Sequence, residues 1–194
     1  MRITGGEMRG RRLTAPTGRA IRPTTDRVRE SLFNILAHAP WAKLTGAKLT
    51  TGEALVLDAF AGAGTLGFEA LSRGAERVWF WDQAAGATSV IRETANQLKV
   101  SDRVQVQRLD ATKPPAAPRP VDLIFLDPPY EQGFLPLSMA GLLASGWLHA
   151  DTLLMAETKK REHLVLDGHW QLLDRRDIGD TGLNFLRLQP EDAV

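Results

Sequence analysis

The tetrapeptide Asp127-Pro128-Pro129-Tyr130 follows an apolar run at residues 121–126 and combines residue types that suit chemistry on an amine. A carboxylate and a backbone carbonyl together accept the two N–H protons of an aromatic amine, which localises its lone pair and stabilises the positive charge that develops on nitrogen. Asp127 supplies the carboxylate and Pro128 the carbonyl, whose direction the consecutive prolines fix. Tyr130 offers a flat face on which an extruded base can stack. We therefore predict a catalytic group at Asp127, Pro128, Pro129 and Tyr130, against the alternative of a rigid turn with a buried tyrosine.

A second motif is the glycine-rich loop within residues 57–67, which follows a predicted strand at 54–60 and opens a helix at 65–73. Glycine allows a tight turn and a close approach to a ligand, and the helix N-terminus offers unpaired N–H groups. Gly62, Gly64 and Gly67 satisfy the pattern G-x-G-x-x-G, and Asp82 follows about 20 residues later. This loop alone leaves both a dinucleotide and S-adenosylmethionine open as ligands.

Aspartates at three predicted strand ends favour S-adenosylmethionine. Asp58 suits the charged amino-acid end of that cofactor and opposes a pyrophosphate, Asp82 suits ribose hydroxyls, and Asp110 can accept from the adenine amino group. The alternative is that these side chains only cap helices or turns. The predicted cofactor-binding residues are Asp58, Phe60, Ala61, Gly62, Gly64, Asp82, Gln83, Asp110, Ala111 and Asp127.

The elements that must position these residues form an α/β pattern. Near-continuous apolar runs separated by helices indicate a parallel sheet covered on both faces. We expect a Rossmann-like methyltransferase core at residues 54–194, with a mostly parallel seven-stranded sheet and an antiparallel pair at its edge. Strands are predicted at 54–60, 77–82, 104–110, 121–127, 152–158, 170–177 and 183–189, and helices at 65–73, 84–99 and 134–144. A loop is predicted at 113–120.

The N-terminal part has a different character. Residues 1–23 predict a small β-hairpin and an extended arm, and residues 26–38 predict an amphipathic helix capped by the preceding threonines. Residues 39–53 are expected to form a loop. The chain has a net charge of +1, but residues 1–30 alone carry +5, which suggests that this segment faces an anion. A solvated basic surface is the alternative.

The composition excludes several classes of protein. The 194 residues contain no cysteine, which rules out disulfides and thiolate sites. The apolar runs are strand-sized, so we expect neither a signal peptide nor a membrane-spanning helix, and a cytoplasmic protein is the default. The four histidines have no metal-ligand spacing, and no metal is expected. Trp79 and Trp81 alternate on a strand and are expected to pack in the core.

These motifs resemble those of the Asp-Pro-Pro-Tyr amino-methyltransferases, which modify adenine N6, cytosine N4, guanine N2 or a protein glutamine. Residues 2–6, 9–11 and 22–34, together with 58–67, 69–75 and 127–130, resemble the RsmD family of 16S rRNA (guanine-N2)-methyltransferases. Residues 39–52 and 113–120 match nothing in that pattern. The resemblance implies S-adenosylmethionine as donor, S-adenosylhomocysteine as product, and a monomer that acts on 16S rRNA in a partly assembled small ribosomal subunit.

The resemblance and the basic N-terminal charge together predict the residues that contact RNA. They are Arg9, Arg11, Arg12, Arg22, Thr24, Thr25, Arg27 and Arg29.

Three alternative functions stay open. An adenine-N6 methyltransferase on DNA or RNA shares the catalytic motif, but it does not fit the N-terminal segment. A nicotinamide-dependent oxidoreductase would use the glycine loop and leave residues 127–130 without a role. A catalytically silent RNA-binding assembly factor would not need an intact tetrapeptide.

Overall fold

The structure, a computed structural model, describes residues 1–14, 25–130 and 132–190. The predicted arm at 15–23, with Arg22, and the threonine at 24 (Thr24) lie outside these residues.

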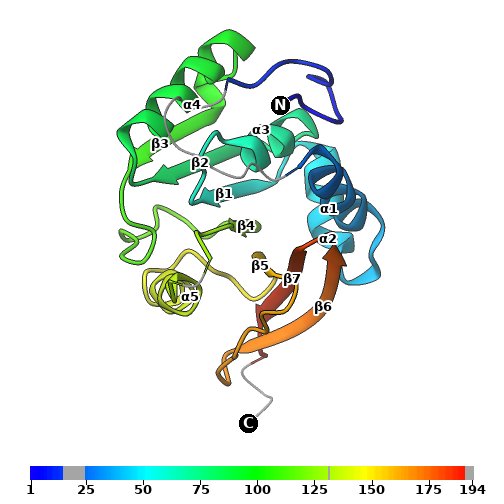
Figure 1. The fold of residues 1–194 in the computed structure, drawn as a ribbon, viewed down its shortest axis with the longest axis vertical. Helices are drawn as coiled ribbons and strands as arrows, with labels where there is room; N and C mark the ends of the chain where they lie inside the picture. The colour runs from blue at the N-terminus through cyan, green and yellow to red at the C-terminus, as the bar shows by residue number, and fades with distance from the viewer. Residues whose placement is uncertain (15–24, 131, 191–194) are drawn as a thin grey trace.

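A single seven-stranded sheet forms the centre of the molecule, in the order β3-β2-β1-β4-β5-β7-β6 (Figure 1). Its strands are β1 (Leu55–Ala59), β2 (Arg77–Asp82), β3 (Val104–Arg108), β4 (Leu123–Leu126), β5 (Leu153–Lys159), β6 (Trp170–Ile178) and β7 (Thr181–Leu188). The pairs among β1 to β5 are parallel, and β7 is antiparallel to both β5 and β6. The predicted methyltransferase-like sheet is therefore confirmed, and its antiparallel strand lies second from the edge.

Helices cover the two faces of the sheet unequally. Alternate strand residues such as Val56, Phe80 and Phe125 join a core with α1 (Asp26–His38), α3 (Thr65–Ser72) and α4 (Ala85–Leu98). The opposite face, with Leu57 and Leu126, packs against the single helix α5 (Phe134–Ala144). The inner strands β1, β4 and β5 are buried on both faces, which explains their nearly continuous apolar sequences, whereas the edge strands β3 and β6 are partly exposed.

The two strand tryptophans are core residues, as expected. Trp79 and Trp81 are buried on the α5 face, and both rings meet Trp147 edge-on, at 5.9 Å and 4.7 Å between centroids. Edge-to-face pairs of this kind are favourable because the ring edge and face carry opposite partial charges. The aromatic pattern of this strand thus serves packing.

Residues 1–13 fold into a short antiparallel loop on α3. The amide of Ile3 donates to the carbonyl of Arg11 at 3.0 Å, and the amide of Leu13 donates to Met1 at 3.1 Å. The pairing amounts to one isolated bridge, between Arg2 and Arg12, so the predicted hairpin is present in reduced form. Ile3, Met8 and Leu13 are buried and fix this loop to the core.

The helix predicted from residue 26 is confirmed as α1. The side chain of Thr25 accepts a hydrogen bond from the amide of Val28 at 3.3 Å, which satisfies one of the free N–H groups at the start of the helix. Asp26 lies in the first turn, where a carboxylate is stabilised by the helix dipole. Capping of the helix thus explains Thr25 and Asp26.

The prediction of a loop at residues 39–53 is wrong. These residues form a 3-10 turn (η1, Pro40–Ala42) and a helix (α2, Lys43–Thr51). Gly46 hides this helix in the sequence, because glycine weakens a helix interior. Here glycine is required, since an added Cβ would lie 2.5 Å from the carbonyl oxygen of Leu36 where α2 crosses α1 (Figure 1).

At the amino edge of the sheet, α2 is joined to the strands through Asp122. Its Oδ2 accepts from the amide of Leu55 at 2.8 Å, and its Oδ1 pairs with Lys48 and lies 3.3 Å from Nε2 of His149. Burial opposes ionisation of this carboxyl, but the bonds from Leu55 and Lys48 outweigh it and lower the pKa of Asp122. This edge is held by a buried, ionised aspartate.

Two connections lack regular structure. Residues 113–120 form the predicted irregular loop, and residues 160–169 pass from β5 to β6 without a helix. The second connection crosses on the face that α5 covers, where Leu164 and Leu166 pack against its core. No helix in the described part of the chain is long and apolar enough to span a membrane.

Candidate functional site

The predicted site residues gather at the carboxyl edge of the parallel strands. Asp58 lies in β1, Asp82 ends β2, Asp110 follows β3, and Asp127 follows β4. The order of the strands switches at the β1–β4 pair, and ligands of open α/β sheets bind outside the strand ends at such a point. The topology thus brings together residues that lie up to about 70 positions apart in the sequence.

The glycine-rich loop has a fixed and unusual backbone. Gly62 and Gly64 have φ angles of 56° and 74°, and Phe60 adopts a φ of 72° although it is not glycine. A non-glycine residue in this region costs on the order of 1–2 kcal/mol, which the surrounding structure must offset. The amide of Ala61 donates to the carbonyl of Trp81 at 2.8 Å, and the Phe60 ring stacks on Phe134 with centroids 6.0 Å apart.

Asp58 is a buried carboxyl beneath this loop, with 2% of its surface exposed. Its Oδ2 accepts from the amide of Gly67, at the start of α3, at 2.9 Å. Burial raises the pKa of Asp58 to about 7, the charge of Asp82 adds to the rise, and the hydrogen bond from Gly67 reduces it. A cationic group placed against Asp58 would stabilise its ionised form.

Asp82 links the loop to the neighbouring strand. Its Oδ2 accepts from the amide of Gly62 and its Oδ1 from the amide of Ala84, both at 2.8 Å. The adjacent residue, Gln83, is exposed, and its carbonyl accepts from Nε of Arg108 at 2.9 Å. The half-buried Asp82 carboxylate keeps lone pairs beyond these two bonds, because each oxygen can accept more than one.

Asp110 has a different environment. Its Oδ1 accepts from both the side chain and the amide of Thr112, at 2.7 and 2.9 Å. The bonds from the Thr112 side chain and amide lower the pKa of Asp110, with further contributions from Gln83 and Lys113. Asp110 is therefore an ionised acceptor next to the buried Ala111.

The tetrapeptide stands at the end of β4. Asp127 and Tyr130 are half-buried and Pro128 is buried. The hydroxyl of Tyr130 donates to Oε1 of Glu157 at 2.7 Å, and Nζ of Lys159 lies 5.8 Å from the centre of its ring. Burial raises the pKa of Tyr130, as do the hydrogen bond and charge of Glu157, so the hydroxyl stays protonated.

Glu157 is a site residue that the sequence reasoning missed. It lies in β5, is 5% exposed, and its Oε1 also accepts from the hydroxyl of Thr181 at 3.5 Å. A carboxylate within a buried apolar run is the signal that could have identified it, because burying a charge is costly without partners.

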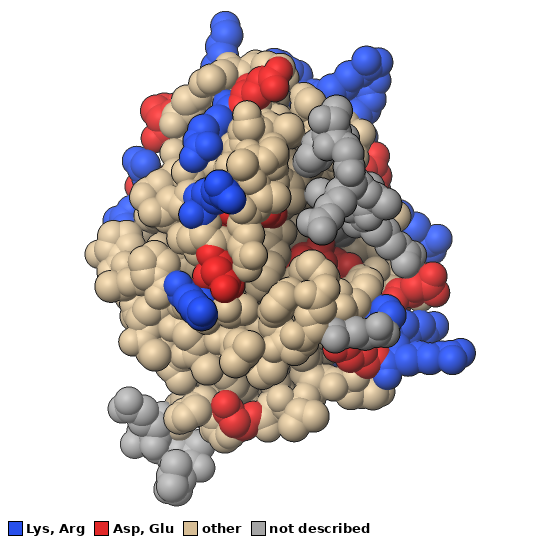
Figure 2. All heavy atoms as spheres, turned by 60° about the vertical axis from the view of Figure 1, so that its left-hand side comes forward, with Lys and Arg blue, Asp and Glu red and all other residues tan. Residues whose placement is uncertain are grey.

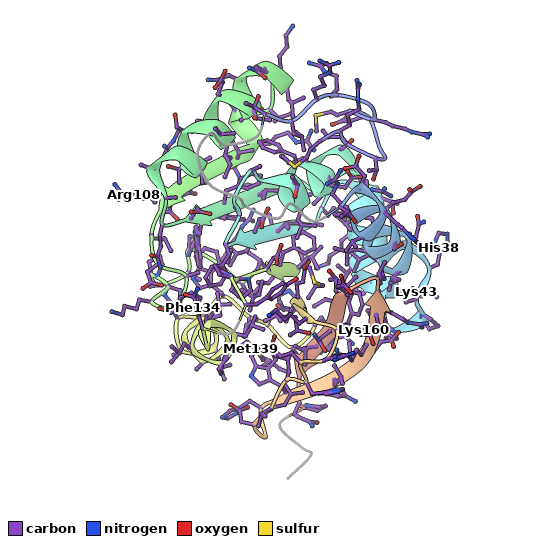
Figure 3. All side chains as sticks on the ribbon, viewed as in Figure 1. His38, Lys43, Arg108, Phe134, Met139 and Lys160 are labelled. Carbon is purple, nitrogen blue, oxygen red and sulfur yellow. The ribbon has the colours of Figure 1, made fainter. Side chains whose placement is uncertain are left out.

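A cleft of about 380 Å³ opens beside the tetrapeptide. One wall holds Pro128, Pro129, Tyr130 and Glu157. The other walls come from α5, including Phe134 and Met139 (Figure 3), and from the connection at residues 162–167, and Trp170 also lines the cleft. The cleft therefore lies next to the predicted catalytic group, and the connection between β5 and β6 lines part of it.

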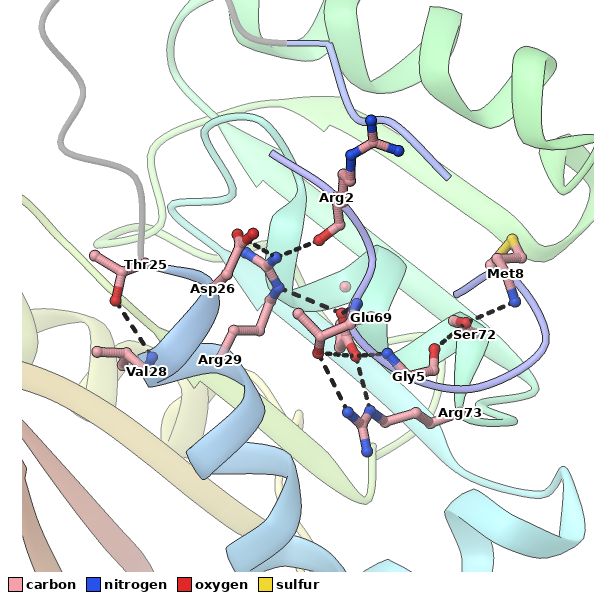
Figure 4. Close-up of polar contacts among 12 residues, drawn as sticks. Arg2, Gly5, Met8, Thr25, Asp26, Val28, Arg29, Glu69, Ser72 and Arg73 are labelled. Carbon is pink, nitrogen blue, oxygen red and sulfur yellow. Dashed lines mark hydrogen bonds and ion pairs between the residues drawn. The ribbon is translucent and has the colours of Figure 1, made fainter. Parts of the chain in front are cut away.

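The structure corrects the prediction for Arg29. Its side chain is fully buried, not available to RNA, and donates to Oε2 of Glu69 at 3.3 Å, to Oδ1 of Asp26 at 2.8 Å and to the carbonyl of Arg2 (Figure 4). Glu69, in α3, also accepts from the amides of Thr4 and Gly5, each at 2.8 Å. This network joins the N-terminal loop, α1 and α3.

The remaining described RNA-contact candidates are accessible. Thr25, Arg9, Arg11, Arg12 and Arg27 are all exposed. In Figure 2, carboxylates lie in the central hollow of one face, and side chains of both charges lie around it. Within residues 1–14, 25–130 and 132–190, no group of three or more acidic or histidine side chains could hold a metal ion.

Comparison with known proteins identifies the family. The model of the family described as "Conserved hypothetical protein 95" matches residues 1–187. The chain is 33% identical to "Ribosomal RNA small subunit methyltransferase D" of Haemophilus influenzae over 183 residues, which cover 92% of this chain and 89% of the relative. It is also 33% identical to the protein of that name from Escherichia coli strain K12, over 98% of this chain and 91% of the relative.

A solved structure agrees with these relatives. The structure of yhhF from Escherichia coli matches with a TM-score of 0.82 and 29% identity, over 97% of this chain and 98% of that chain. The resemblance that the sequence motifs carried is therefore confirmed, and the chain belongs to the conserved hypothetical protein 95 family, which is the RsmD family.

Proposed function

We propose that this protein transfers a methyl group from S-adenosylmethionine to the exocyclic N2 of a guanine in 16S rRNA of the small ribosomal subunit. The observation that carries the proposal is the tetrapeptide at residues 127–130, which stands at the strand switch beside the glycine-rich loop. Relatives named as small-subunit rRNA methyltransferases support the choice of rRNA.

The residues present fit S-adenosylmethionine. Asp58 lies under the loop with a raised pKa of about 7, so it gains from an ammonium group such as that of the methionine end. Asp82 offers acceptors for ribose hydroxyls, and in this proposal Asp110 and Ala111 receive the adenine. The other proposed cofactor contacts are Phe60, Ala61, Gly62, Gly64 and Gln83. Bound there, the cofactor supplies an electrophilic methyl group on a sulfonium.

The tetrapeptide then acts on the amine. The Asp127 carboxylate and the Pro128 carbonyl accept the two N–H protons, which directs the nitrogen lone pair toward the methyl group. Pro128 and Pro129 fix the carbonyl, and the Tyr130 ring supports the extruded base. Positive charge on the attacking nitrogen is offset by Asp127, to which a proton can then pass. In-line alignment of the reacting atoms contributes the rest of the acceleration.

The remainder of the chain serves recognition and folding in this proposal. Residues 1–38 face RNA through Arg9, Arg11, Arg12, Arg22, Thr24, Thr25 and Arg27, and residues 54–194 form the catalytic part. The proposed substrate is 16S rRNA in a partly assembled subunit in the cytoplasm, and the enzyme acts as a monomer without a metal.

The decisive experiment measures transfer of labelled methyl to small-subunit particles from a strain that lacks this protein. We expect label on one guanine N2, and a loss of at least about 100-fold with Asp127→Ala, because an electrostatic stabiliser of the reacting group is removed. Asp151→Ala, an exposed change at the opposite edge of the sheet, should retain activity. Label on adenine in place of guanine would refute the substrate assignment and leave the reaction class intact.

A further inference from the structure

Glu157 and Asp127 occupy equivalent places on neighbouring strands. In the parallel β4–β5 pair, Leu126 is opposite Ala156, so Asp127 and Glu157 are the next residues along the two strands. Tyr130 joins them, because its hydroxyl bonds to Glu157 and the charges of both carboxylates contribute to raising its pKa. Glu157 and Tyr130 also line the same cleft.

Two adjacent carboxylates match the edge of guanine and not that of adenine. Guanine presents neighbouring donors, the N1–H and the exocyclic N2 amine, whereas adenine presents an acceptor at N1. A carboxylate oxygen can accept more than one hydrogen bond, so Glu157 can bond to Tyr130 and to a base at the same time. Because Glu157 is buried, its interactions are weakly screened by water.

We propose that Glu157 determines the base specificity of this site: its carboxylate accepts the N1–H of the target guanine while Asp127 accepts from the N2 amine. An adenine would place its N1 lone pair against the Glu157 carboxylate and be rejected. Sites built to bond an N–H discriminate strongly against analogues that lack it, because buried polar groups are then left unpaired. This inference rests on the proposed guanine-N2 activity and adds the residue that selects the base.

The test uses 2-aminopurine, which keeps the exocyclic amine of guanine but lacks the N1–H and the O6, so the change of preference in a Glu157 variant is what assigns the effect to N1–H. Reconstituted small-subunit particles would carry guanine or 2-aminopurine at the position labelled in the first experiment. For the wild-type protein we expect kcat/KM to be roughly 10- to 100-fold higher with guanine, as for loss of a hydrogen bond to a charged group. In Glu157→Gln the amide can donate to N1 of 2-aminopurine, so this preference should fall toward unity or reverse.

The control is Glu162→Gln, which changes another carboxylate of the same cleft and should keep the wild-type preference. If Glu157→Gln slows both substrates by the same factor, Glu157 only supports Tyr130 and the inference is overturned. If the variant does not fold, equal rates of the wild type on the two bases would still overturn the inference, because they would exclude any acceptor for N1–H. Absence of guanine methylation by the wild type would instead contradict the proposed function itself.

Discussion

A buried carboxyl such as Asp58 is more informative about a ligand than an exposed one. Its pKa of about 7 means that the folded, ligand-free protein holds a proton there which an unfolded chain would release near pH 4. Asp58 therefore favours folding at low pH, and this contribution is lost as the pH rises toward 7. A bound cation would favour the ionised form of Asp58 over the protonated form, because it stabilises the carboxylate.

We therefore expect the affinity for S-adenosylmethionine to rise with pH up to about 7. Above that pH the Asp58 carboxyl is fully ionised, so the affinity should level off. Below pH 7, binding should release a proton, because the ammonium of the ligand lowers the pKa of its partner. Calorimetry in two buffers with different ionisation enthalpies measures that proton. Asp58→Asn should bind more weakly and lose this pH dependence, and a wild-type affinity that is flat from pH 5.5 to 8 would contradict the assignment.

Residue types alone predict part of the candidate site. Asp127 to Tyr130 and the glycine loop could be predicted because their spacing relative to strand ends is local in sequence. The burial of Arg29 could not, because it depends on partners such as Glu69 that lie 40 residues away, and Glu157 had only the signal of a carboxylate within an apolar strand. An arginine in a basic segment has the same sequence signature whether it faces RNA or a buried glutamate.

At the scale of elements, Glu69 is the main polar attachment of the N-terminal loop. Thr4, Gly5, Arg29 and Arg73 all donate to its carboxylate, which is fully buried. The helix that follows the glycine loop thus also holds the segment proposed to face RNA. Loss of this attachment would separate the N-terminal loop from α3, the helix that follows the glycine-rich loop.

We expect Glu69→Ala to destabilise the fold by about 3–5 kcal/mol, because it leaves the buried Arg29 without one of its carboxylate partners. Denaturant unfolding measures the free energy. The matched control is Glu76→Ala, which removes an exposed partner of Arg119 and should change stability by no more than about 0.5 kcal/mol. Equal stability of the two variants would show that the network contributes little.

Helix α2 marks the limit of local sequence reasoning for elements. Its sequence contains Gly46 and three threonines, which are weak helix formers, and only Thr45 and Leu49 in it are buried. The helix exists because of contacts far along the chain: the crossing with α1 at Gly46 and the pairing of Lys48 with Asp122. The strands, by contrast, are indicated by apolar runs in the local sequence, and their packing in the sheet agrees with that local signal. Their positions were therefore predicted to within a few residues.

At the scale of the molecule, charge is divided between a basic N-terminal segment and an acidic remainder. Residues 1–30 carry a net charge of +5, and the remaining residues carry −4, which gives the chain its total of +1. The aspartates at the strand ends lie along the carboxyl edge of the sheet. An RNA phosphate is attracted to the first region and repelled by the second. This arrangement favours docking through the margin of the site, with only the target base entering it.

We expect the double variant Arg11→Ala, Arg12→Ala to weaken RNA binding and to reduce its dependence on salt. Each lost phosphate contact lowers the slope of log affinity against log salt by roughly 0.7–0.9, because fewer counterions are released. A filter-binding titration at several salt concentrations measures the slope. Arg176→Ala, which removes an exposed arginine paired with Asp174 on β6, is the control, and an unchanged slope in the double variant would refute the role of these arginines.

The amino edge of the sheet, held by Asp122, has a practical consequence for watching this protein at work. The chain contains no cysteine, so Asp151→Cys would create a unique attachment point for a fluorescent dye. Strand β5 separates that edge from Glu157 by roughly 13 Å, at about 3.3 Å for each residue from Leu153 onward. A dye placed there could report the arrival of a labelled ribosomal particle through energy transfer while the reacting edge stays unmodified.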